Sequence, residues 1–247
     1  MGKVLVAVTW CSNAKHYVMP KFWEMLDACV RHDDVDILVL GDQSDVPEWV
    51  VHEPVSWKSG STYAEDMLWA TRDYATEYAK AGDYDVMVWH GVDALWQSRA
   101  DFWQVLSNLG DVHAVAPLIS PRNDSSRAIA RRFIGNGAGS YSLQQVDIPR
   151  TELESGKLVS SGFPGADNIM ISRKAFDIGF DGHSAWYQRV SNGGTNVCVE
   201  EYWVWRALVK GYRVAVDTSV KVWHVHEDLV ARMPYGIEKP LGDITWL

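Results

Sequence analysis

Hydrophobic residues in the first 117 positions alternate between short continuous runs and stripes with helical spacing. The mainly apolar runs are typical of buried strands, and they lie at residues 4–8, 35–40, 85–89 and 111–117, with a further short strand expected at 49–55. The stripes lie between these runs, at residues 20–30, 62–78 and 101–109. The stripe at 62–78 opens with Thr62-x-x-Glu65, the spacing of a helix capping box. This alternation predicts an α/β fold with a mostly parallel central sheet flanked by helices.

The alternation stops at residues 120–164. Gly135, Gly137 and Gly139 and the polar residues around them predict long loops with short elements, the kind of segment in which binding sites often lie. Regular structure is expected again as a strand, a helix and two further strands, at residues 168–172, 201–210, 212–216 and 220–225. Too few strand–helix pairs are present for a TIM barrel. We therefore expect one domain over residues 1–247 with an open, Rossmann-like sheet.

Composition and charge narrow the classes of function. The chain is 47% hydrophobic, and none of its apolar runs approaches the ~20 residues of a membrane span. The N-terminus lacks the features of a secretory signal, so a cytoplasmic location is expected. A net charge of -9 makes nucleic acid a less favoured partner, because phosphate backbones repel an acidic protein. The three cysteines form no CxxC pair, which argues against a structural zinc site.

Ligands of open parallel sheets bind at the carboxyl ends of the strands. No GxGxxG follows the first strand and no P-loop motif occurs, which disfavours dinucleotide dehydrogenases and P-loop NTPases. Polar or aromatic residues instead follow several of the predicted strands. They are Thr9 and Trp10, Asp42, His90 and Asp93, and His224 and His226.

Several weak motifs occur in a consistent order between residues 3 and 226. They are Asp42 after the second strand, Arg72 in Thr-Arg-Asp, Gly91-Val92-Asp93 after the strand at 85–89, Asp167-Asn168, Glu200-Glu201, and Lys-Val-Trp-His224. In this order they resemble the GT-A-fold glycosyltransferases, which move a sugar from a nucleotide-sugar donor to an acceptor. The resemblance implies a nucleotide-binding half at residues 1–117 and an acceptor-binding half at residues 118–247.

The resemblance also implies roles for the donor-side residues. Asp42, Thr9, Trp10 and Arg72 match positions that hold the nucleotide. Asp93 matches the second carboxylate of the family's Asp-x-Asp motif, which contacts the nucleotide and a divalent cation, Mn²⁺ or Mg²⁺. Gly91 stands where the first carboxylate is expected, and His224 matches the histidine that completes the metal site in many members. Either His90 or His226 is an alternative partner for Asp93.

On the acceptor side, Asp167 and Asn168 match positions that face the sugar. Glu200 matches the catalytic carboxylate, and the neighbouring Glu201 is an alternative because a sequence pattern defines the start of a helix only to within ~2–4 residues. In an inverting reaction, such a carboxylate takes the proton of the acceptor hydroxyl. Retention and inversion both stay open.

The resemblance thus implies an enzyme that uses a UDP- or GDP-sugar and a divalent cation. The acceptor is left open among a glycan, a protein, a lipid and a modified nucleic acid. One alternative is a sugar-phosphate nucleotidyltransferase, although residues 9–13 lack the glycine-rich loop of those enzymes. Another is a non-catalytic module that binds a nucleotide-sugar or a glycan. Gly91, which stands in place of a carboxylate, is the residue that favours this second alternative.

Overall fold

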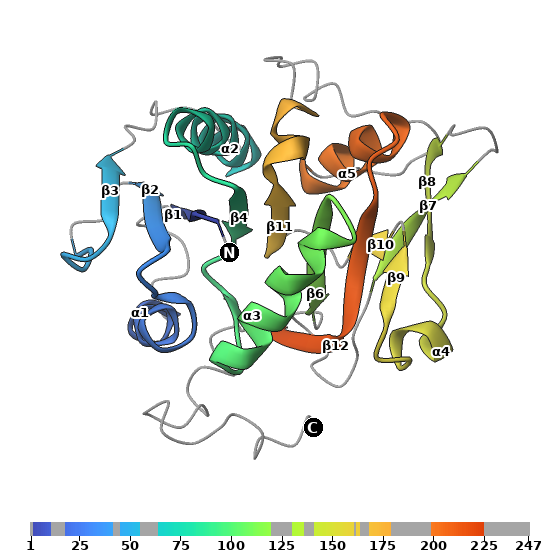
Figure 1. Cartoon of the computed structure of the whole chain (residues 1–247), viewed down its shortest axis with the longest axis horizontal. Helices are drawn as coiled ribbons and strands as arrows, with labels where there is room; N and C mark the ends of the chain where they lie inside the picture. The colour runs from blue at the N-terminus through green and yellow to red at the C-terminus, as the bar shows by residue number, and fades with distance from the viewer. Residues whose placement is uncertain are drawn as a thin grey trace.

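The strands of the computed structural model form one large mixed sheet and a smaller three-stranded sheet beside it (Figure 1). The structure describes residues 2–10, 18–41, 45–54, 64–119, 130–135, 141–160, 162–163, 168–178 and 199–224. The strands of the large sheet are β1 (Val4–Trp10), β2 (Val35–Gly41), β3 (Val51–Pro54), β4 (Val86–His90), β5 (Ala94–Leu95), β6 (Ala114–Ile119), β9 (Leu158–Ser160), β11 (Ile169–Ser172) and β12 (Val214–His224). The smaller sheet contains β7 (Arg131–Gly135), β8 (Tyr141–Asp147) and β10 (Gly162–Phe163). The predicted α/β class is confirmed.

Helices cover both faces of the large sheet (Figure 1). One face carries α1 (Met19–Met25), its π-helical continuation η2 (Leu26–Val30), and α3 (Arg99–Ser107), which ends in the 3-10 turn η3 (Asn108–Gly110). The other face carries α2 (Ala64–Ala81), α5 (Val199–Val209) and the 3-10 helix η4 (Arg173–Ile178). The short helix α4 (Arg150–Leu153) lies beside the smaller sheet (Figure 1). The sheet therefore has a separate hydrophobic core on each face.

The strand order of the large sheet is β3-β2-β1-β4-β11-β6-β12-β5, and β9 also pairs with β12. The strands β3, β2, β1 and β4 are parallel neighbours, and β6 is parallel to β12. Between these groups lies β11, antiparallel to both β4 and β6. All the parallel strands therefore end at one edge of the sheet, called here the carboxyl edge, and begin at the opposite amino edge.

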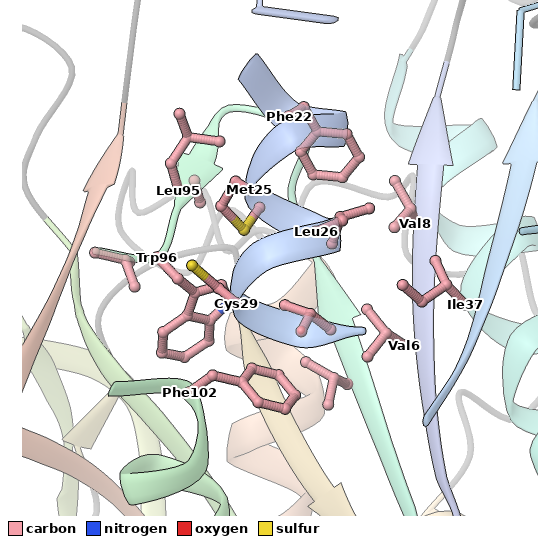
Figure 2. Close-up of a cluster of buried hydrophobic side chains, with 14 of the residues drawn as sticks. Val6, Val8, Phe22, Met25, Leu26, Cys29, Ile37, Leu95, Trp96 and Phe102 are labelled. Carbon is pink, nitrogen blue, oxygen red and sulfur yellow. The ribbon is translucent and has the colours of Figure 1, made fainter. Parts of the chain in front are cut away.

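Alternation along β1 divides its side chains between the two cores. Val4, Val6, Val8 and Trp10 belong to the core under α1 and α3, and Leu5 and Ala7 belong to the core under α2 and α5. Figure 2 shows the first of these cores, where the helix side chains lie between β1 on one side and Trp96 and Phe102 on the other.

Two positions in this framework require glycine, one because of a close approach and one because of a left-handed backbone. Gly41 ends β2 opposite Trp10, and a Cβ at Gly41 would lie 1.9 Å from the Trp10 carbonyl oxygen. Gly211 has φ +83 and ends α5, with backbone N–H groups of Gly211 and Tyr212 bonded to carbonyls of Leu208 and Ala207. Left-handed backbone of this kind favours glycine at a helix C-terminus.

Two sequence-based expectations need correction. Residues 212–216 and 220–225 were expected as two strands, but β12 is one strand whose register against β6 shifts between Asp217 and Lys221. The segment 120–164 was expected to be mainly loops, yet β7 and β8 pair as an antiparallel hairpin within it. The capping box at Thr62 lies outside the described residues.

Candidate functional site

The carboxyl edge brings together Asp93 and His224 from distant parts of the chain. The two-residue strand β5 pairs with the end of β12, so that Ala94 lies opposite His224. This register places Asp93, the residue before β5, beside the last residue of β12. Nε2 of His224 lies 3.1 Å from Oδ2 of Asp93. The Asp93 side chain is 0% exposed and that of His224 is 21% exposed, so the pair joins a buried carboxylate to a ring that reaches solvent.

Asn168 lies beside Ala94, the residue that follows Asp93. Its Nδ2 atom is 3.5 Å from the carbonyl oxygen of Ala94, and the side chain is fully buried. The backbone of Asn168 has φ +64, a left-handed conformation that asparagine tolerates better than most residues. Its Oδ1 atom has no hydrogen-bond partner within the described residues. A buried acceptor therefore lies at the start of β11, close to Asp93.

His90 ends β4 near the same edge, but both of its ring nitrogens are engaged. The indole Nε1–H of Trp96 donates to His90 Nε2 at 2.9 Å, which leaves the ring proton on Nδ1, 2.8 Å from the Gly91 carbonyl oxygen. Burial lowers the pKa of His90 to about 4, so the ring is neutral at pH 7. These contacts argue against His90 as the second ligand of a metal at Asp93. The bond from Trp96 was not anticipated from the sequence.

The predicted nucleotide-side residues lie on both faces of the sheet. The hydroxyls of Thr9 in β1 and Thr71 in α2 are 2.8 Å apart. The next residue in α2, Arg72, is buried, with its guanidinium 5.2 Å from the centroid of the Trp89 ring. Trp10 faces the other way and packs on Phe22 and Trp23 in the opposite core. Thr9 and Arg72 thus share a face, whereas the described contacts of Trp10 are with core aromatic residues.

Glu201 in α5 is nearly buried against the β7–β8 hairpin. Its Oε2 accepts a hydrogen bond from Gln145 Nε2 at 3.1 Å, and its Oε1 lies 4.0 Å from Arg131 Nη1. Through these contacts, Glu201 links α5 to the β7–β8 hairpin. Glu200 precedes it in α5. Asp42, Asp167 and His226 lie outside the described residues, and their predicted roles stay predictions.

Within the described ranges, no group of three or more histidine, cysteine, aspartate or glutamate side chains is placed to hold a metal ion. Asp93 and His224 are therefore two donors, one oxygen and one nitrogen, at a site that would need further ligands. In the same part of the chain, no helix combines the length and the apolar character that crossing a membrane requires.

Comparison with known proteins identifies the fold. No protein-family model matches the chain, and no curated protein matches it. Solved structures do match, among them the crystal structure of GalNAc-T7 with UDP, GalNAc and Mn²⁺, with a TM-score of 0.58 and 13% sequence identity. The match covers 92% of this chain but only 44% of the GalNAc-T7 chain. The chain therefore has a GT-A-like fold and spans less than half the length of this structural neighbour.

Proposed function

We propose that the chain is a glycosyltransferase that moves a sugar from a UDP- or GDP-sugar to an acceptor hydroxyl. The observation that carries the proposal is the contact between Asp93 and His224 at the carboxyl edge of a GT-A-like sheet. The structural neighbour was solved with UDP and Mn²⁺, which supports a nucleotide-sugar donor and a divalent cation. The acceptor class stays open among a glycan, a protein, a lipid and a modified nucleic acid.

The two donor atoms fit a divalent cation such as Mn²⁺. A carboxylate oxygen and an imidazole nitrogen are both metal ligands, and Asp93 Oδ2 and His224 Nε2, 3.1 Å apart, are close enough to hold one ion together. Binding would require Nε2 to release its proton and offer its lone pair. When bound, the cation would supply positive charge against the diphosphate leaving group. Asp93 and His224 would hold it, and substrate phosphate oxygens and water would complete its ligands.

Other residues of this chain would position the donor. Arg72 is a permanent cation on the face of the large sheet that α2 covers, and its guanidinium geometry suits phosphate oxygens. Thr9 lies on that face through its bond with Thr71. Asn168 Oδ1, buried beside Asp93, would accept a hydrogen bond from a sugar hydroxyl. Asp42 and Trp10 stay proposed contacts of the nucleobase, and Asp167 a proposed contact of the sugar.

A carboxylate on the acceptor side would take the proton of the attacking hydroxyl. Glu200 and Glu201 were both predicted for this role, and the contacts of Glu201 with Gln145 and Arg131 tie that side chain to the hairpin. This favours Glu200 as the general base and Glu201 as the residue that positions α5. General-base catalysis by a placed carboxylate typically contributes ~10²–10⁴-fold in rate.

A non-catalytic binding module is the alternative that a specific observation favours. Gly91 replaces a carboxylate of the predicted motif, and the described part of the chain offers only Asp93 and His224 as a pair of metal ligands at this edge. Such a module would bind a nucleotide-sugar without breaking it down. The difference between the two functions is donor turnover.

A thermal-shift screen followed by a turnover assay tests the proposal. UDP, GDP and CDP are each added with Mn²⁺ or with EDTA, and saturation at 100 times the dissociation constant should stabilise the fold by ~2.7 kcal/mol. We expect one base to raise the melting temperature only with Mn²⁺. Release of the nucleotide from the matching sugar donor then supports the enzyme, and binding without release supports the module. No shift with any nucleotide in the presence of Mn²⁺ would contradict both.

A further inference from the structure

A pocket of about 280 Å³ lies at the amino edge of the large sheet, the edge opposite Asp93 and His224. Arg213, the residue before β12, lines this pocket, whereas His224 is the last residue of that strand. The pocket is thus separated from the carboxyl edge by the length of β12. Its polar lining consists of Asp85, His113, Ser172, Arg173, Lys174 and Arg213.

Strand register builds the wall of this pocket. Ala114 pairs with Ile171 on one side and with Val214 on the other, which brings together His113, Ser172 and Arg213. The carbonyl oxygen of His113 accepts hydrogen bonds from the backbone N–H and the hydroxyl of Ser172, at 2.9 and 3.0 Å. The backbone N–H of His113 donates to the Arg213 carbonyl oxygen at 2.8 Å. The wall is therefore held by the sheet itself.

The charges around the pocket are mostly positive. Arg173 is engaged by Asp83 and by the Tyr84 carbonyl oxygen, both at 3.0 Å. The carboxylate of Asp85 accepts the backbone N–H of Lys3 at 3.0 Å. Lys174 and Arg213 are exposed and form no ion pair with any residue that the structure describes. On a chain of net charge -9, two such cations beside one pocket make a local positive site.

His113 adds a neutral hydrogen-bond donor. Its Nδ1 accepts the backbone N–H of Arg213 at 3.0 Å, which places the ring proton on Nε2. Burial lowers the pKa of His113 below its ordinary value, and the nearby charges of Arg213 and Lys174 lower it further. The ring therefore stays neutral at pH 7 and keeps an N–H group to donate. A histidine whose protonation is opposed by two cations reports a positive local potential.

We propose that this pocket binds a small soluble phosphate-type oxyanion, either inorganic phosphate or a water-soluble phosphate monoester. Lys174 and Arg213 would form charge-assisted hydrogen bonds with the phosphate oxygens, and His113 would donate a neutral one. The volume of about 280 Å³ is just below the ~300–1,000 Å³ of ordinary ligand sites, which suits a small anion better than a dinucleotide. The proposed anion site is independent of the proposed nucleotide-sugar site, because the two lie at opposite edges of the sheet.

Phosphate titration by calorimetry tests this site directly. Inorganic phosphate is added in EDTA, at an ionic strength held constant with NaCl, to the wild type and to the double variant Lys174→Gln/Arg213→Gln. The control is Arg99→Gln/Lys157→Gln, which removes the same charge from exposed residues that do not line the pocket. We expect saturable binding by the wild type and the control, and affinity at least tenfold weaker in the pocket variant. Absence of saturable binding, or equal affinity in both variants, would overturn the proposal.

Three further measurements locate the anion and identify its source. Phosphate should raise the pKa of His113 in a proton NMR titration, because a bound anion favours the imidazolium. The variant Asp93→Asn should bind phosphate like the wild type, and loss of binding in that variant would place the anion at the carboxyl edge instead. Binding to vesicles that contain phosphatidic acid, without any binding of free phosphate, would also overturn the proposal in favour of a lipid surface.

Discussion

Nε2 of His224 lies 3.1 Å from Oδ2 of Asp93, although the two residues are 131 positions apart in the sequence. Their contact depends on the pairing of Ala94 with His224, the last residue of β12. A fully buried carboxylate needs such a partner, because an isolated charge in the interior costs several kcal/mol. The pair thus links the start of β5 to the end of β12, and it also forms the centre of the proposed donor site.

Replacement of either member of this pair should remove metal-dependent nucleotide binding. Asp93→Asn keeps the shape of the side chain but weakens it as a metal ligand, and His224→Gln removes the imidazole nitrogen. We expect each variant to bind UDP or GDP with Mn²⁺ at least tenfold more weakly than the wild type does, approaching the weak binding of the wild type in EDTA. Calorimetric titration measures both affinities. Unchanged Mn²⁺-dependent affinity in both folded variants would exclude this pair as the metal site.

The two neighbouring glutamates should separate into a chemical and a structural role. Glu200→Gln should lower kcat for release of the nucleotide by ~10²-fold or more at nearly unchanged KM, because only the proton acceptor is lost. Glu201→Gln should retain most of kcat and lose about 1 kcal/mol of stability, since its contacts with Gln145 and Arg131 are weakened. Steady-state kinetics and urea unfolding measure the two effects. The reverse pattern would assign the base to Glu201.

His90 should make the fold less stable in weak acid. Its pKa is about 4 in the folded state and about 6.5 in the unfolded chain, so the unfolded state binds more protons between these values. The stabilisation is complete above pH 6.5 and is lost as the pH falls towards 4. At pH 5 the loss is about 2 kcal/mol. Urea unfolding at pH 7 and pH 5 measures it.

His90→Gln is the matched control for this pH dependence. Its amide oxygen can accept from Trp96 and its amide N–H can donate to the Gly91 carbonyl, as the two ring nitrogens do. This variant does not titrate, so the difference in stability between pH 7 and pH 5 should shrink by about 2 kcal/mol. If the free energy of unfolding depends equally on pH in the wild type and the variant, His90 is not the residue that destabilises the fold in weak acid.

Asn168→Gly should affect the sugar rather than the nucleotide. Glycine adopts the φ of +64 without strain, so the backbone at the start of β11 is retained while the amide is removed. We expect weaker binding of the nucleotide-sugar by several-fold and unchanged binding of the nucleoside diphosphate. Competition titrations with both ligands measure the difference. Equal loss for both ligands would assign Asn168 to the nucleotide or to the fold.

The central strands were predictable because burial on both faces leaves a continuous apolar run in the sequence. The runs at residues 4–8 and 35–40 became β1 and β2 with few changes at their ends. The β7–β8 hairpin was missed because Arg131, Arg132 and the nearby glycines hide its alternation. The polar residues around Asp217 suggested a break in β12, but Asp217 is bonded to Asn108 and Ser219 and the strand continues.

The candidate site was only partly predictable, because the sequence pattern indicates which residues lie at strand ends but not which side chains contact one another. Motif order indicated Asp93 and His224, and the fold places them in contact. Side-chain contacts between neighbouring elements leave no periodic signal in a sequence. We therefore could not anticipate the hydrogen bond from Trp96 to His90 or the contacts of Glu201 with the hairpin. The opposite orientation of Thr9 and Trp10 does follow from strand alternation, once residues 9 and 10 are assigned to β1.

The position of β11 has a consequence for synthesis of the protein on the ribosome. The strands β4 and β6 are complete by residue 119, but each pairs with β11, which comes 50 residues later at Ile169–Ser172. A nascent chain that has emerged only to β6 therefore exposes three unpaired strand edges to other polypeptides, one of β4 and both of β6, because β12 also pairs with β6 and comes later still. We expect ribosome-stalled fragments that end before residue 169 to require chaperones, and protection from protease to appear abruptly once β11 has left the exit tunnel.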